Sequence, residues 1–183
     1  RRYESEGGPS PDEILDILAG SREASRDRAD FVISQIAFWL LAATDGHAKN
    51  FSIAHAPADG FALTPLYDVL SAWPVIGHGP RLLPLQDARL AMAVRGRTRH
   101  YRIAEIQARH WYALALRVGG VGLWRNVVER VQSSNAAMDR ALDALPQGFP
   151  EAVASSIAAG VRAQTERFMF GLAHLSAEKA ANG

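Results

Sequence analysis

The stretch "LLAATDGHAKNFSIAHAPADGFALTPLYDVLSAWP", residues 40–74, joins an apolar segment to a group of ionisable residues. Residues 36–43 are apolar on almost every side, which predicts a helix that runs through the middle of a core. Directly after that segment come four polar side chains, Asp45, His47, Lys49 and Asn50, and a second isolated acid, Asp68, follows further on. The stretch therefore indicates either a reactive loop fixed on a buried helix or an ordinary turn.

The composition is that of an ordinary globular protein. The 183 residues, 48% hydrophobic and 21% charged, are enough for one domain, residues 1–183, with a core of its own. A formal net charge of +1 gives no general reason to expect nucleic-acid or membrane binding, and the longest apolar run is too short to span a bilayer. The absence of cysteine excludes disulfides and thiolate metal sites. Because the polar first residues lack the apolar core of a secretory signal, we expect a cytoplasmic protein.

Helices account for most of the expected secondary structure. Ser10 followed by Pro11 and, three residues after the serine, Glu13 is typical of a capped helix start, and Gly20 ends that helix. A second helix is expected over residues 23–44. Three more are predicted over residues 103–118, 122–145 and 150–176, separated by Gly119-Gly120 and by a proline-containing stretch.

A β-hairpin follows the polar group. Residues 51–55 and 61–64 alternate around a turn signal at residues 57–60, which predicts two short antiparallel strands. Residues 81–101 show a weaker pattern, interpreted as a loop with a short helix near residues 85–93. The expected fold class is therefore mainly α with a small β-hairpin.

The spacing of the polar residues fits phosphoryl transfer. That chemistry needs a carboxylate at the acceptor hydroxyl and oxygen ligands that hold magnesium on the phosphates. Asp45 and Asn50 are five positions apart, as are the base and the magnesium-binding Asn of a kinase catalytic loop, and Asp68 follows Asn50 by 18 positions, after the hairpin. Lys49 would lie beside phosphate charge, and His47 would hold the loop or touch a phosphate.

Spacing alone leaves two interpretations open, because Asp-Gly and Asn are also common turn formers. A zinc site is disfavoured, since His47 and His55 lie on opposite sides of a loop–strand junction and no further ligand has suitable spacing. His110 and His174 are interpreted as ordinary helix residues.

Three strings, "YESEGGP", "WLLAATDGHAKNFSI" and "LTPLYDVLSAWPV", resemble the C-terminal lobe of the HipA-type serine/threonine kinases, the toxins of bacterial toxin–antitoxin pairs associated with persistence. The resemblance implies a kinase-like fold in which this region is a mostly helical lobe, with the catalytic loop and metal-binding turn in residues 44–71 and the helical remainder in residues 103–177. It implies ATP and Mg²⁺ as cofactors and Asp45 as the catalytic residue. The implied nucleotide-binding residues are His47, Ala48, Lys49, Asn50, Tyr67 and Asp68, of which Asn50 and Asp68 hold the metal.

The resemblance also implies that catalysis needs parts of a kinase that residues 1–183 do not contain. A complete family member has an N-terminal lobe with a phosphate-covering loop, a nucleotide-binding lysine and a regulatory serine, and we expect this chain to be inactive without that lobe. The implied partners are a HipB-like DNA-binding antitoxin, DNA reached through the antitoxin complex, and a translation-related protein substrate such as a glutamyl-tRNA synthetase.

A non-enzymatic interaction module that contributes to antitoxin or operator DNA binding is the alternative function. In that case the basic run at residues 95–102, or Arg109 and Arg117 on the next helix, would face DNA phosphates. A solvated loop is the simpler interpretation of the run, because charge runs usually mark exposed faces.

Overall fold

Five α-helices and two antiparallel hairpins build the chain in a computed structural model that describes residues 1–56, 60–96 and 98–181. The mainly helical class predicted from the sequence is confirmed. The helices are α1 (Pro11–Leu18), α2 (Ala24–Leu40), α3 (Ala108–Gln132), α4 (Ser134–Asp143) and α5 (Glu151–Ala181), and the strands are β1 (Ile53–Ala56), β2 (Gly60–Leu63), β3 (Arg89–Arg95) and β4 (Arg99–Arg102). Short 3-10 turns occur at η1 (Glu4–Glu6), η2 (Ala48–Asn50), η3 (Trp73–Val75) and η4 (Ile103–Glu105).

The start of α1 is the one that the sequence predicts. The Ser10 hydroxyl accepts a hydrogen bond from the backbone N–H of Glu13, and the Glu13 carboxylate accepts one from the backbone N–H of Ser10. These two bonds satisfy donors that the first turn of a helix leaves free. The helix ends at Leu18, two residues before Gly20, and buries Leu15 and Leu18.

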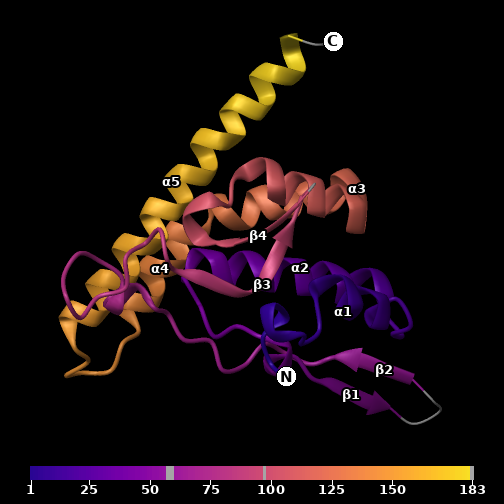
Figure 1. Cartoon of the computed structure of the whole chain (residues 1–183), viewed down its shortest axis with the longest axis horizontal. Helices are drawn as coiled ribbons and strands as arrows, with labels where there is room; N and C mark the ends of the chain where they lie inside the picture. The colour runs from indigo at the N-terminus through magenta and orange to yellow at the C-terminus, as the bar shows by residue number, and fades with distance from the viewer. Residues whose placement is uncertain (57–59, 97, 182–183) are drawn as a thin grey trace.

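Helix α2 runs through the middle of the molecule and packs against α1, α3, α5 and both hairpins (Figure 1). Its Trp39 is fully buried and contacts the rings of Trp111 on α3 and Phe168 on α5, at centroid distances of 6.0 and 6.5 Å. The Trp39 indole N–H also donates to the carbonyl of Ile103, at 3.2 Å. Six of the eight residues 36–43 are buried and the other two, Ala37 and Leu41, are partly buried, so the predicted core position of this run is confirmed. The predicted helix end at residue 44 is wrong, because α2 ends at Leu40.

Of the two hairpins in the structure, the sequence predicted only the first. Strands β1 and β2 pair in antiparallel register from Ile53 with Leu63 to Ala56 with Gly60, which confirms the expected hairpin; its predicted turn residues 57–59 lie outside the described residues. The helix expected near residues 85–93 is wrong, since β3 and β4 form a second hairpin there. All five interior residues of β3 are buried. A strand buried on both faces reads as a continuous apolar run, which periodicity alone does not distinguish from a helix.

The C-terminal part is helical, with shifted boundaries. Helix α3 begins at Ala108 because residues 103–105 form the turn η4, and it kinks at Gly120, whose φ of +66° is non-helical, where a break was predicted. The helix expected over residues 122–145 is divided at Ser133 into the end of α3 and α4. Helix α5 packs against α3 and α4, and its C-terminal end projects from the body (Figure 1).

Candidate functional site

The end of α2 fixes both halves of the candidate site. Ala42, with φ at +48°, turns the chain out of the helix. Helix-end carbonyls have no partner within the helix, and here three residues that follow Asp68 in the sequence supply partners. The indole of Trp73 donates to Leu40, the hydroxyl of Ser71 to Leu41 and the backbone of Ala72 to Ala42, at 2.8, 2.6 and 3.1 Å. One buried helix therefore positions the loop that follows it and the turn at Asp68.

The loop lies directly against the ring of a buried phenylalanine. A Cβ added to Gly46 would be 2.5 Å from a ring carbon of Phe38, whose side chain is 1% exposed. Only a glycine leaves room for this contact, so the backbone between Asp45 and His47 is held against the core.

Asn50 connects the loop with the turn. Its side chain is 2% exposed, its amide oxygen accepts from the backbone N–H of His47 at 2.9 Å, and its amide nitrogen donates to the carboxylate of Asp68 at 2.9 Å. Asp68 has φ at +55°, in a left-handed region that Asp tolerates better than most residues. The two predicted metal ligands, 18 positions apart, are therefore in direct contact.

Asp45 is exposed at the start of the same loop. Its side chain is 52% exposed, and its Oδ1 accepts a hydrogen bond from the Tyr3 hydroxyl at 2.5 Å. The Arg2 guanidinium and the His47 ring nitrogen Nε2 lie 3.9 and 4.0 Å from that oxygen. The hydrogen bond to Asp45, with a contribution from burial, raises the pKa of Tyr3 above its ordinary value. Oδ1 of Asp45 is thus held by the Tyr3 hydroxyl and lies close to Arg2 and His47.

These contacts make one connected set in which Asp45 neighbours His47, His47 is bonded to Asn50, and Asn50 is bonded to Asp68. All of these residues lie in a region of the chain that matches the model of a known protein family. The model of the HipA-like C-terminal domain matches residues 1–152. The chain belongs to this family.

A solved structure supports the same fold for this HipA-like domain. A chain of the HipA, HipB and operator DNA complex from the toxin–antitoxin system of Shewanella oneidensis MR-1 superposes with a TM-score of 0.73 at 22% sequence identity. The match covers 91% of the HipA-like chain and 37% of the Shewanella chain. The chain therefore spans little more than a third of the length of this structural relative.

The remaining predicted residues of the HipA-like site surround this set. The His47 side chain is buried, and its Nδ1 has no hydrogen-bond partner among the described residues. Lys49 is exposed, and Ala48 packs against the core from η2. The Tyr67 hydroxyl bonds to the Lys49 carbonyl at 2.8 Å and to the Ser52 hydroxyl at 2.7 Å, so Tyr67 fastens the turn to the loop.

The donor chemistry of the set fits magnesium. Asn50 and Asp68 offer amide and carboxylate oxygens, which a hard divalent cation prefers. In the part of the chain that the structure describes, no three His, Cys, Asp or Glu side chains are grouped as a metal site.

The contacts of Asp45 at the N-terminal end were missed by sequence reasoning. The neighbouring Glu4 is buried, accepts from the backbone N–H of Ala93 on β3 at 2.8 Å and lies 3.6 Å from Arg99, and it thereby anchors the segment that carries Tyr3. The "YESEGGP" string carried the family resemblance, but nothing in it indicated which residue the tyrosine meets.

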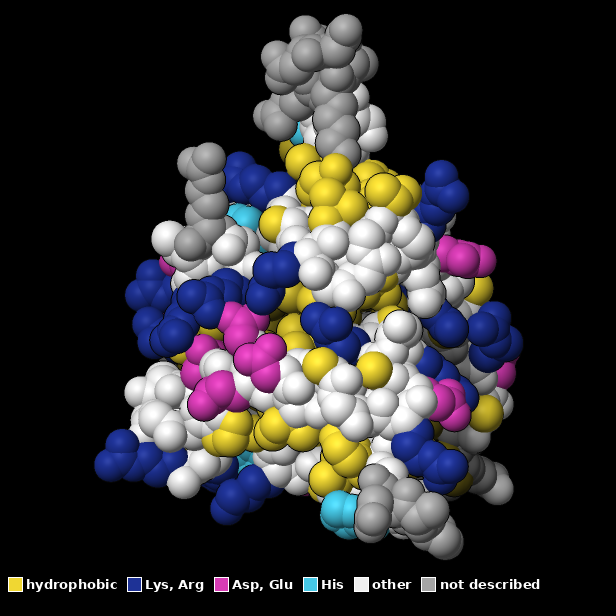
Figure 2. Space-filling view, turned by 90° about the vertical axis from the view of Figure 1, so that its right-hand side faces the viewer, with side chains coloured by type: hydrophobic (Ala, Val, Ile, Leu, Met, Phe, Trp, Pro, Cys, Tyr) yellow, Lys and Arg dark blue, Asp and Glu magenta, His cyan; other side chains and the backbone are white. Residues whose placement is uncertain are grey.

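The basic run is largely neutralised by acids of the same chain. Arg95 and Arg117 both pair with Asp12. Burial would raise the pKa of Asp12, but the hydrogen bonds from the two arginines outweigh it and hold that pKa below its ordinary value. Arg99 pairs with Glu4, and Arg102 with Glu105 at 3.1 Å, whereas residue 97 lies outside the described residues. Figure 2 shows acidic and basic side chains side by side on one face of the molecule.

Among the described residues, no helix is both long and apolar enough to cross a membrane.

Proposed function

We propose that this HipA-like domain is the catalytic-loop lobe of a serine/threonine protein kinase that uses ATP and Mg²⁺. The observation that supports this proposal best is the 2.9 Å hydrogen bond between Asn50 and Asp68, which brings two oxygen-bearing side chains together beside the exposed carboxylate of Asp45. A structural turn would explain the Asp45–Asn50 spacing, but it would not require a second acid held against a buried asparagine.

In this proposal Asp45 orients the acceptor hydroxyl and accepts its proton. The Tyr3 hydroxyl holds Oδ1 of Asp45, which leaves Oδ2 to face a substrate hydroxyl. Asn50 and Asp68 hold Mg²⁺, which when bound neutralises phosphate charge that the two acids would otherwise repel. His47, Ala48, Lys49 and Tyr67 line the nucleotide, and the ammonium of Lys49 is free to reach a phosphate because its side chain is exposed.

The partners proposed for the domain come from its family and its structural relative. The Shewanella structure is of a HipA, HipB and operator DNA complex, and we extend this to a HipB-like antitoxin and to DNA bound through that antitoxin. The protein substrate is proposed to be translation-related, with a glutamyl-tRNA synthetase as the first to test. Because phosphoryl transfer needs groups that cover and neutralise the phosphates, the domain is proposed to act together with an N-terminal kinase lobe and to be inactive alone.

An interaction module without catalysis is the second candidate, favoured by the composition of the Shewanella complex. The ion pairs of Arg95, Arg99 and Arg102 count against the basic run as its DNA-binding element. In this candidate the polar loop would be a structural turn, and its replacement would leave antitoxin binding unchanged.

The deciding experiment is a phosphoryl-transfer assay on the domain joined to an N-terminal kinase lobe. Asp45→Asn should abolish transfer while leaving the melting temperature unchanged, because the carboxylate is exposed and contributes little to the core. Asp16→Asn, an exposed acid on α1, is the matched control and should retain activity. Transfer by the Asp45 variant at a near-normal kcat would refute the kinase proposal.

A further inference from the structure

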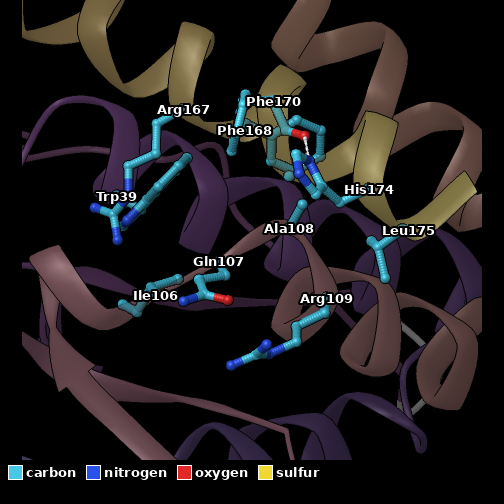
Figure 3. Close-up of a pocket in the computed structure, with 11 residues that line it drawn as sticks. Trp39, Ile106, Gln107, Ala108, Arg109, Arg167, Phe168, Phe170, His174 and Leu175 are labelled. Carbon is cyan, nitrogen blue, oxygen red and sulfur yellow. Dashed lines mark hydrogen bonds between the residues drawn. The ribbon is translucent and has the colours of Figure 1, made fainter. Parts of the chain in front are cut away.

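A cavity lies between the start of α3 and the C-terminal half of α5, away from the proposed kinase site (Figure 3). Its volume is about 320 Å³, at the lower end of the range of small-molecule pockets, roughly 300–1,000 Å³. None of the residues proposed for the kinase site lines it. The lining residues are Trp39, Ile106, Gln107, Ala108, Arg109, Arg167, Phe168, Phe170, Gly171, His174 and Leu175.

The ionisable side chains of this cavity are all basic. Arg109, Arg167 and His174 line it, and none of the eleven lining residues is acidic. Among the described residues, neither arginine is within ion-pair distance of an Asp or Glu; the ion pairs of the chain involve other basic residues. The Nε of Arg109 donates to the Nε2 of His110 at 3.4 Å, and this partner is not an acid. An anion inside the cavity would therefore meet two cationic side chains and no competing acid.

Arg167 is the more buried of the two arginines. Its guanidinium donates to the carbonyls of Ile103, at 3.1 Å, and Ala104, and both acceptors are neutral. Burial lowers the pKa of Arg167, since lost solvation disfavours the cation. A partly desolvated cation with only neutral partners is incompletely compensated, and an anionic group would compensate it.

Apart from Gln107, the remaining walls are apolar and aromatic. Phe168 and Trp39 are fully buried, whereas the Phe170 ring, two positions further along α5, is 70% exposed. Figure 3 shows the side chains of α5 and those at the start of α3 on opposite sides of the cavity. An aromatic body would cover the Phe170 ring, and aromatic pairs are stabilised beyond the area that they bury.

We propose that this cavity binds a small aromatic carboxylate, with its ring against Phe170 and Leu175 and its carboxylate facing Arg109 and Arg167. A carboxylate fits better than a phosphate dianion, because a single charge costs less to transfer into a cavity with mainly apolar walls. The volume accommodates one or two rings, which favours a free small molecule over a folded partner. This site is independent of the proposed kinase function.

The test uses 1-naphthoate as the probe and 1-naphthamide as its uncharged counterpart, each titrated into the protein by isothermal titration calorimetry. The carboxylate should bind at least about tenfold more tightly than the amide, as expected for a charge-assisted hydrogen bond. Arg109→Gln and Phe170→Ala should each weaken naphthoate binding, while Arg125→Gln, an exposed arginine of α3 outside the cavity, should leave it unchanged. Because all three side chains are exposed, circular dichroism should show the same fold in each variant.

Three results would overturn the proposal. The first is equal affinity for naphthoate and naphthamide, and the second is a naphthoate affinity that is unchanged in Arg109→Gln. The third is no detectable naphthoate binding at concentrations up to about 1 mM, because a Kd weaker than about 1 mM would not indicate a specific site. Loss of binding in Arg109→Gln but not in Phe170→Ala would overturn the aromatic part of the proposal, since the anion would then bind without its ring against α5.

Discussion

Replacing Gly46 with alanine tests how the core positions the candidate loop. The added Cβ would lie 2.5, 2.7 and 2.9 Å from three ring carbons of Phe38, and distances below 3.0 Å force an adjustment. Phe38 is 1% exposed and contacts the Phe51 ring at 5.7 Å, so it has little room to withdraw. Overpacking a rigid core costs about 1–3 kcal/mol, and we expect Gly46→Ala to lower the free energy of unfolding by that amount in urea titrations.

A double-mutant cycle with Phe38→Leu identifies the cause. If the clash with the ring is responsible, the smaller leucine should relieve it, and the two changes should couple by about 0.5–3 kcal/mol, the range for residues in contact. Gly122→Ala is the matched control, because a Cβ there meets nothing within 4 Å and the residue lies in α3. It should be neutral, or stabilising by up to about 1 kcal/mol. A Gly46→Ala variant as stable as the control, or one whose cost is unaffected by Phe38→Leu, would refute the packing argument.

Three further predictions concern single side chains. Trp39→Ala should lower the free energy of unfolding by about 3–5 kcal/mol, as for large aromatic side chains removed from a core, and Leu41→Ala, only partly buried on the same segment, should cost less in the same urea titration. Tyr3→Phe, made in the two-lobe protein, should lower kcat of phosphoryl transfer and leave the KM for ATP unchanged if the hydroxyl positions Asp45; an unchanged kcat would make the contact incidental. The pKa of His110 is lowered from 6.5 to about 4, first by burial and then by the charges of His100, Arg109 and Arg167. Between those two pH values the unfolded chain binds more protons, so stability should fall as the pH drops from about 6.5 to 4, and the His110→Gln variant should show a flatter profile in pH-dependent thermal melts.

The parts of the fold that were predictable from sequence depend on local signals. The capping residues Ser10 and Glu13 act within one turn, and the first hairpin pairs two segments that are close in the sequence. The buried end of α2 was predictable because residues 36–43 are apolar on almost every side. These features need no knowledge of distant partners.

The parts that were missed depend on contacts between distant segments. Strand β3 is buried between other elements, so its apolar run carried no alternation, and the helix predicted there was wrong. The early end of α2 depends on Ser71, Ala72 and Trp73. These residues lie about 30 positions further along the chain and donate hydrogen bonds to the carbonyls at the end of the helix.

The candidate site shows the same division between local and distant signals. Kinase-like spacing brought Asp45, Asn50 and Asp68 to attention, and the structure brings Asn50 and Asp68 into contact, but their roles remain predictions. The Tyr3 hydroxyl on Asp45 was not predictable, because it depends on where Glu4 anchors the N-terminal segment on β3.

The most direct test of the central claim locates the metal on the protein. Mn²⁺ replaces Mg²⁺ in the presence of ATP, and paramagnetic broadening of backbone amide signals is measured by NMR on the isotope-labelled chain. This method detects the metal even when it binds weakly. If Asn50 and Asp68 hold the metal of a nucleotide complex, the amides of residues 47–50 and 67–69 should broaden first, and the Asp68→Ala variant should lose that pattern. Broadening centred elsewhere, or the same pattern in the Asp68 variant, would contradict a magnesium–nucleotide site at this loop.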